Sequence, residues 1–162
     1  MQSINETYPA EKTTLYALLA EQMQALLKGE RNLIANLANA SALLNTALKD
    51  INWVGFYLME GSELVLGPFQ GKVACVRIAV GRGVCGTAVA TDTTQLVYDV
   101  HQFPGHIACD SASNSEIVVP LHDAGSVIGV LDIDSPLVGR FDAQDQEGLE
   151  EVARIIEQAC WG

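Results

Sequence analysis

The sequence predicts an α+β fold with a mostly antiparallel sheet of about six strands and helices at both ends of the chain. Leucine-rich segments with helical spacing occur near both ends, whereas β-branched, alternating segments cluster between them. These strand-like segments do not alternate with long helices, which argues against parallel βαβ units. We expect the terminal helices to cover one face of the sheet and a ligand pocket to lie on the other.

The helical segments have recognisable spacing or boundaries. The first runs from after Pro9 to about Lys28 and the second from about Arg31 to Leu48, each with leucines on one face. A short helix opened by glycines is expected over residues 84–91. The last helix is expected to begin at Asp142, which is a good N-cap residue.

The strand-like segments are short and separated by turn residues. A long polar loop is expected from Asp99 to Asn114, and loops of that length are often functional. Turns at 60–62 and 122–126 predict two hairpins. The expected strands are Ile51–Met59, Glu63–Gly67, Ala74–Val80, Gln95–Asp99, Glu116–His122 and Ser126–Asp134.

The composition limits the classes of partner. The 162 residues suffice for one domain, and 49% hydrophobic with 18% charged residues is typical of a globular protein. A net charge of −11 with nine basic residues argues against nucleic acid or an anionic membrane surface as partner. The N-terminus lacks the basic start and apolar run of a signal peptide, so we expect a cytoplasmic protein with reduced cysteines.

Two aspartates one residue apart are the most informative feature of the chain. Asp132 and Asp134 end an apolar, β-branched segment. Because residues two apart on a strand share a face, both carboxyl groups are expected to point the same way, roughly 7 Å apart. An unpaired buried carboxylate is costly, so a cation or a proton donor is expected beside them.

Further residues are expected to complete a pocket on the same face. Trp53 and Tyr57 share one side of the first strand around Gly55, whose missing side chain leaves room for a ligand. Glu116 begins another apolar strand and adds a third acid. If these residues converge with the two aspartates, they form an acidic cup with aromatic walls. Such a cup suits a small molecule that combines an ammonium group with a compact apolar part. Two aromatic residues packed under a loop remain the structural alternative.

The cysteines differ in their expected surroundings. Cys75 is placed in a strand and Cys85 in a glycine-rich turn, whereas Cys109 lies in the polar loop. Cys160 is expected to be a small core residue. An accessible loop thiol can act as a nucleophile, although nearby carboxylates would raise its pKa above about 8.5 until a cationic ligand binds.

The sequence argues against two other kinds of site. The chain has no C-x-x-C pair or H-x-x-x-H spacing, so no metal site is expected, and His101 and His106 are interpreted as solvated loop residues. Residues 81–86 fit the pattern G-x-G-x-x-G. The following helix is too short and the unit stands alone, so these glycines are interpreted as shaping a turn, not as binding a dinucleotide.

Six segments of the chain together carry a family resemblance. They are Ile51-Asn-Trp-Val-Gly-Phe-Tyr57, Leu66-Gly-Pro-Phe-Gln-Gly-Lys72, Gly81-Arg-Gly-Val-Cys-Gly-Thr-Ala88, Gly105-His-Ile-Ala-Cys-Asp110, Ser113-Asn-Ser-Glu-Ile117 and Gly129-Val-Leu-Asp-Ile-Asp-Ser135. These segments resemble the free methionine-(R)-sulfoxide reductases, which are small GAF-domain enzymes. The resemblance extends from the first helix to Phe141 and keeps the same block order. It implies a single GAF-like catalytic domain over residues 1–162.

The resemblance implies a role for each candidate thiol. Cys109 resembles the nucleophile, Cys75 the preferred resolving cysteine, and Cys85 a further thiol that helps recycling. The family is homodimeric and metal-free, uses no bound cofactor, and is re-reduced by thioredoxin. The expected process is the repair of an amino acid damaged by oxidative stress.

The remaining site residues are also assigned through the resemblance. Trp53 and Tyr57 resemble the wall that receives the methyl end of the substrate. Glu116, Asp132 and Asp134 resemble the acids that hold the sulfoxide oxygen and the ammonium group. Clustered acids raise one another's pKa, so a protonated carboxyl group is available to donate, although the residue that donates is left open.

The expected reaction begins with attack of the Cys109 thiolate on the sulfoxide sulfur, giving methionine and a sulfenic acid. A second thiol, Cys75 before Cys85, then forms a disulfide, which thioredoxin reduces. A non-catalytic GAF sensor fits the same fold and pocket but leaves Cys109 unexplained. A thiol peroxidase is the third alternative, and it would need no acidic cup.

Overall fold

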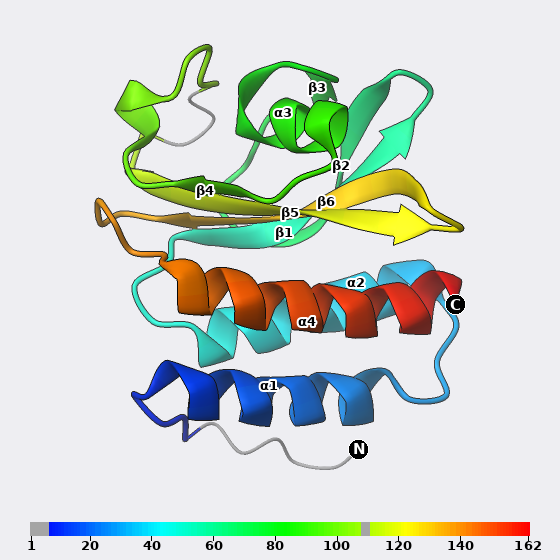
Figure 1. Cartoon of the computed structure of the whole chain (residues 1–162). Helices are drawn as coiled ribbons and strands as arrows, with labels where there is room; N and C mark the ends of the chain where they lie inside the picture. Colours follow the sequence, from blue (N-terminus) through cyan, green and yellow to red (C-terminus); the bar gives the residue numbers. More distant parts are fainter. Residues whose placement is uncertain (1–6, 108–110) are drawn as a thin grey trace.

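The computed structural model describes residues 7–107 and 111–162 (Figure 1). Six strands form one sheet in the order β3-β2-β1-β6-β5-β4, and every neighbouring pair is antiparallel. The predicted α+β fold with a six-stranded antiparallel sheet is therefore confirmed. The elements are α1 (Lys12–Leu27), α2 (Leu33–Ala47), β1 (Trp53–Glu60), β2 (Glu63–Gly71), β3 (Arg77–Ala79), α3 (Gly83–Thr91), β4 (Gln95–Val97), the 3₁₀ helix η1 (Val100–Gln102), β5 (Ser115–Asp123), β6 (Ser126–Ser135) and α4 (Ala143–Trp161).

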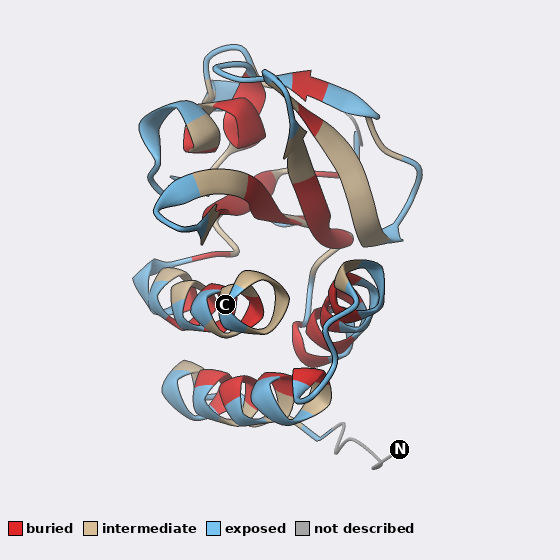
Figure 2. Ribbon diagram, turned by 90° about the vertical axis from the view of Figure 1, so that its right-hand side faces the viewer, coloured by how far each residue is buried: buried red, intermediate tan, exposed pale blue. Residues whose placement is uncertain are grey.

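The helices form two layers on one side of the sheet. Figure 1 shows α2 and α4 directly beneath the strands, with α1 farther out against both helices. The prediction that helices from both ends of the chain cover one face of the sheet is confirmed, with α2 and α4 in contact with the strands and α1 packed on these two helices. Figure 2 shows the buried residues of these helices on their facing sides. The principal core therefore joins α1, α2, α4 and the helix-facing side chains of β1, β5 and β6.

A buried carboxylate ties the first helix to the last. Asp145, in the first turn of α4, is completely buried. It accepts hydrogen bonds from the hydroxyl group of Tyr16 at 2.7 Å and the ammonium group of Lys12 at 2.6 Å. Asp142 is the predicted N-cap, and it forms a capping box with Asp145. Because Asp145 belongs both to the cap of α4 and to its contact with α1, these two helices depend on each other.

Every strand differs from its predicted bounds at one end or both, most of all β2, β3 and β4. The expected strand Ala74–Val80 is reduced to β3, because the backbone before it leaves the sheet and its Cys75 carbonyl oxygen accepts a hydrogen bond from Tyr57. The expected strand Gln95–Asp99 ends at Val97, since Asp99 caps η1 by accepting from the backbone of His101. The expected strand Glu63–Gly67 continues to Gly71. Alternation does not reveal these ends, because tertiary contacts determine them.

The opposite face of the sheet carries α3 and the loop that contains η1 (Figure 1). A second apolar cluster lies there, formed by residues of β1, α3, β5 and β6. Gly81 and Gly83 have positive φ angles of 85° and 61°, so the glycines of the G-x-G-x-x-G pattern shape the turn into α3, as expected. An antiparallel sheet also lacks the parallel unit that a dinucleotide site requires. Within the described ranges, every helix is too short or too polar to cross a lipid bilayer.

Candidate active site

A cavity lies between the face of the sheet opposite α2 and α4, helix α3 and the loop after η1. Its volume is about 40 Å³, which is enough to hold a few water molecules. The lining includes the expected Trp53, Tyr57, Cys85, Glu116, Asp132 and Asp134, together with Val73, Ala74, Ile78, Arg82, Gly83, Val84, His106, Ile107 and Ser113.

The register of three adjacent strands brings the expected residues together. Asp134 on β6 lies opposite Trp53 on β1 and opposite Glu116 on β5. Asp132 lies opposite Gly55 on β1. Paired residues of an antiparallel sheet share a face, so residues distant in the sequence project toward the same cavity. The alternation of residues along each strand predicted which side chains lie on the cavity face of the sheet. The register between the strands brings these side chains close to one another.

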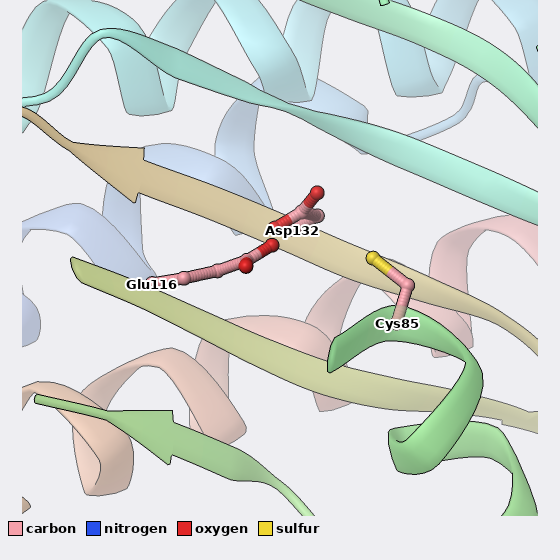
Figure 3. Close-up of side chains that lie close together, drawn as sticks. All are labelled: Cys85, Glu116 and Asp132. Carbon is pink, nitrogen blue, oxygen red and sulfur yellow. The ribbon is translucent and has the colours of Figure 1, made fainter. Parts of the chain in front are cut away.

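Glu116 and Asp132 form a buried acidic pair. Their side chains are 6% and 5% exposed, and Figure 3 shows them facing each other from β5 and β6. Burial raises the pKa of Glu116 well above its ordinary value, and the nearby charges of Asp132 and Asp134 raise it further. Burial also raises the pKa of Asp132, although hydrogen bonds from Glu116 and Cys85 partly oppose this. The two acids therefore keep a proton to higher pH than isolated carboxyl groups do.

One oxygen of this pair lacks a hydrogen-bond donor. Among the described residues, Oδ1 of Asp132 has no partner. A buried acceptor without a partner costs roughly 1–3 kcal/mol, and a carboxylate costs more. A ligand that brings a donor, above all an ammonium group, would remove this cost.

Aromatic rings form another part of the lining, on the strand next to the two aspartates. Trp53 stacks on Tyr57 with ring centroids 5.9 Å apart and on Phe69 at 5.1 Å. Burial and the neighbouring acids raise the pKa of Tyr57, so its hydroxyl group stays neutral and donates to the Cys75 carbonyl oxygen at 2.9 Å. The idea that Gly55 leaves room for a ligand is wrong. A Cβ atom there would lie 2.2 Å from Cβ of Phe69 and 2.9 Å from the Pro68 carbonyl oxygen, so β2 fills that space.

The thiols occupy different environments. Cys75 is disulfide-bonded and lies in the connection before β3, not in a strand as expected. Cys85, in the first turn of α3, is free and 4% exposed. Burial raises its pKa well above the ordinary value, and the nearby acids raise it further, so it remains a protonated thiol. Cys160 is free and packs against the helical core. Cys109, the expected nucleophile, lies outside the described residues.

One group of side chains could reach a metal ion. The ligand atoms of Cys85, Glu116 and Asp132 all lie within 4.8 Å of one another. Figure 3 shows the sulfur of Cys85 projecting from α3 toward the acidic pair. Metal ligands must be deprotonated, and the pKa of all three groups is raised. A metal ion would therefore compete with protons at every ligand.

Several lining residues were not anticipated. His106 was interpreted as solvated, but it lines the cavity, and burial lowers its pKa. His101 is exposed, as expected, and contacts Asp99 at 2.8 Å. Ser113 is buried in the lining, and Arg82, in the turn before α3, also lines the cavity. His106 and Ser113 belong to the long loop, whose unusual length was the available signal.

Comparison with known proteins agrees with this geometry. The GAF domain family matches residues 12–160. The chain is 59% identical to a free methionine-R-sulfoxide reductase of Escherichia coli over 147 residues, or 91% of this chain and 89% of that protein. The crystal structure of the Neisseria meningitidis free methionine-R-sulfoxide reductase with its substrate superimposes with a TM-score of 0.93. The Neisseria meningitidis protein is 45% identical to this chain, and the alignment covers 98% of this chain and 95% of that protein.

The chain belongs to the free methionine-R-sulfoxide reductase family of GAF-domain proteins. A yeast protein of this family, from Saccharomyces cerevisiae, is 46% identical over 97% of this chain and 92% of its own length. The predicted family resemblance is therefore confirmed, and the protein is an oxidoreductase.

Proposed function

We propose that the protein reduces free L-methionine (R)-S-oxide to L-methionine. The observation that carries this proposal is that, among the described residues, one oxygen of the buried Asp132 has no hydrogen-bond partner, in a cavity also lined by the stacked rings of Trp53 and Tyr57. The carboxylate suits the α-ammonium group, and the rings suit the methyl end. Relatives that share about half of the sequence carry the name of this activity.

The proposed reaction begins at Cys109. Its thiolate attacks the sulfoxide sulfur while a protonated carboxyl group donates to the oxygen, and methionine leaves with a sulfenic acid on Cys109. Glu116 is the favoured donor because burial raises its pKa most clearly. Asp134, opposite Glu116, remains the alternative. The sulfoxide gains two electrons, and the cysteine sulfur loses them.

A second thiol then closes the cycle. Cys75 attacks the sulfenic acid of Cys109, a disulfide forms and water leaves. The disulfide-bonded state of Cys75 and the buried, free thiol of Cys85 support Cys75 as the resolving residue. Thioredoxin then reduces the disulfide by exchange. Four further properties stay predictions. They are reduction by thioredoxin, assembly into a homodimer, a cytoplasmic location and the absence of a metal or cofactor.

One assay tests this function. Thioredoxin-coupled oxidation of NADPH is measured with the R and S epimers of free methionine sulfoxide, with N-acetylmethionine sulfoxide and with peroxide. We expect turnover of the free R epimer alone, because the N-acetylated compound lacks the ammonium group that Asp132 would receive. No turnover with any compound would favour the GAF sensor, and turnover with peroxide alone would favour the thiol peroxidase. Equal rates for the free and acetylated compounds would contradict the role of the acids.

A further inference from the structure

Exposed apolar side chains flank the disulfide-bonded Cys75. Val73 is 88% exposed and Val76 is 60% exposed, and Cys75 lies between them in the connection leading into β3. β3 is an edge strand of the sheet, so no further strand shields this segment on its outer side. Apolar residues clustered at a surface indicate an interaction site more clearly than scattered ones do.

The same segment has an unusual charge. Residues 71–82 contain Lys72, Arg77 and Arg82 and no acidic residue, although the chain has 9 basic and 20 acidic residues and a net charge of −11. All three basic side chains are exposed. Arg77 also contacts Glu63 on β2 at 2.7 Å. A cationic segment on a strongly acidic protein attracts an acidic partner specifically, because the rest of the surface repels it.

We propose that Lys72, Val73, Val76 and Arg77 form a docking surface for an acidic protein dithiol reductant of the thioredoxin class. This proposal rests on the proposed function, which requires repeated reduction of a disulfide. A reductant that attacks Cys75 must bring its own thiolate to the sulfur, so it must contact the residues on either side. In this complex, the two valines contact apolar residues around the reactive cysteine of the reductant. The basic side chains of Lys72 and Arg77 contact acidic residues on the surface of the reductant.

The redox step at this surface is balanced. The thiolate of the reductant attacks Sγ of Cys75, the existing disulfide breaks, and its other sulfur leaves as a thiolate that takes up a proton. The second thiol of the reductant then attacks the mixed disulfide and releases Cys75 as a thiol. The protein gains two electrons and two protons, and the reductant becomes a disulfide.

The test compares two reductants on one protein. The oxidised protein is mixed with reduced thioredoxin or with dithiothreitol, and the appearance of free thiols is followed in a single turnover. In the variant Lys72→Glu/Val76→Glu, we expect the rate constant with thioredoxin to fall at least tenfold. The rate constant with dithiothreitol should stay unchanged, because a small uncharged reductant needs no docking surface.

A matched control makes the same chemical changes elsewhere. Lys28 is exposed after α1, and Ile34 is 71% exposed on α2, on the other side of the sheet. The variant Lys28→Glu/Ile34→Glu should keep the rate of the original protein with both reductants. Added salt should slow the reaction of the original protein with thioredoxin more than that of Lys72→Glu/Val76→Glu.

Three outcomes would overturn the proposal. The first is a rate constant with thioredoxin that is unchanged in Lys72→Glu/Val76→Glu. The second is an equal loss of rate with thioredoxin and with dithiothreitol. The third is a change in the oligomeric state of this variant, which would assign the surface to a second copy of this chain. The assay contains no sulfoxide. Failure of the docking proposal can therefore be distinguished from failure of the proposed function. The latter would appear in a separate assay, as no reduction of methionine sulfoxide even with dithiothreitol as reductant.

Discussion

The hydroxyl group of Tyr57 donates a 2.9 Å hydrogen bond to the carbonyl oxygen of Cys75. The bond joins the aromatic wall of the cavity to the backbone of the disulfide-bonded residue. Ring packing on Trp53 holds the tyrosine from the other side. The position of Cys75 therefore depends on the same side chain that would contact a substrate.

Replacing Tyr57 with phenylalanine removes this hydrogen bond and keeps the ring. A hydrogen bond of this kind contributes about 0.5–1.5 kcal/mol, so we expect disulfide formation after one equivalent of substrate to slow by up to roughly tenfold. Rapid-quench thiol counting measures that rate. Tyr98→Phe, at an exposed position, serves as the control. A rate in Tyr57→Phe equal to that of the original protein would show that the bond does not position Cys75.

The raised pKa of Glu116 predicts the sign of a pH effect on stability. In the unfolded chain the carboxyl group ionises near pH 4.3, whereas in the folded protein it keeps its proton to higher pH. Above pH 4.3 the folded state binds more protons, so the free energy of unfolding falls with pH. The slope approaches 1.4 kcal/mol per pH unit for one proton, up to the folded pKa.

Glu116→Gln should flatten this dependence, because glutamine does not titrate. Urea unfolding between pH 5 and pH 8 measures the slope. The exposed Glu147→Gln is the matched control and should keep the slope of the original protein. An unchanged slope in Glu116→Gln would mean that the carboxyl group is ionised in the folded protein.

The same substitution tests proton donation. If Glu116 protonates the sulfoxide oxygen, Glu116→Gln should lower the maximal rate on the order of 10²–10⁴-fold. Asp134→Asn should then affect mainly the Michaelis constant for the sulfoxide. The reverse pattern would make Asp134 the donor, and weaker affinity with an unchanged maximal rate in both variants would show that the two acids only bind.

The cysteines should separate into distinct roles. Cys109→Ser should abolish turnover because a hydroxyl group is a poor nucleophile. Cys75→Ser should still release one equivalent of methionine and then stop, since no disulfide can form for thioredoxin to reduce. Quantifying methionine per active site distinguishes these cases. Continued cycling in Cys75→Ser would transfer the resolving role to Cys85.

A substitution at Gly55 tests how closely strand β2 packs against strand β1. A Cβ atom at this position would lie 2.2 Å from Cβ and 2.7 Å from Cα of Phe69. Gly55→Ala should therefore destabilise the protein by about 1–3 kcal/mol, as overpacking does. Thermal unfolding measures the change. Because the clash involves Cβ and the backbone, removing the ring in Phe69→Ala should not restore stability, and a full rescue would contradict this account.

Local pattern predicted most of the fold and the face of the sheet that carries the site. Alternation separates Trp53 and Tyr57 from the helix-facing core, and the spacing of Asp132 and Asp134 places them together. Asp142 as a cap also follows from local chemistry, because its side chain bonds to backbone only a few residues away.

The remaining differences arise from contacts between residues distant in the sequence. Cys75 has strand-like neighbours, but Tyr57 holds its backbone away from a regular strand. His106 has a polar neighbourhood, yet it lies half-buried against the cavity. The closeness of Phe69 to Gly55 depends on the register of β2 against β1. No local pattern contains that register.

The buried carboxylate of Asp145 has a consequence for how the protein is made. Its partners Lys12 and Tyr16 leave the ribosome about 130 residues before it does. Helix α1 can therefore take its final place only after the start of α4 has been synthesised, because until then the acceptor for its polar side chains does not exist. Such late, long-range closure slows folding and leaves the part of the nascent sheet that α4 contacts, chiefly β5, exposed. A chain that stops before α4 should stay open to proteases and depend on chaperones, although the residues that line the cavity have all been synthesised.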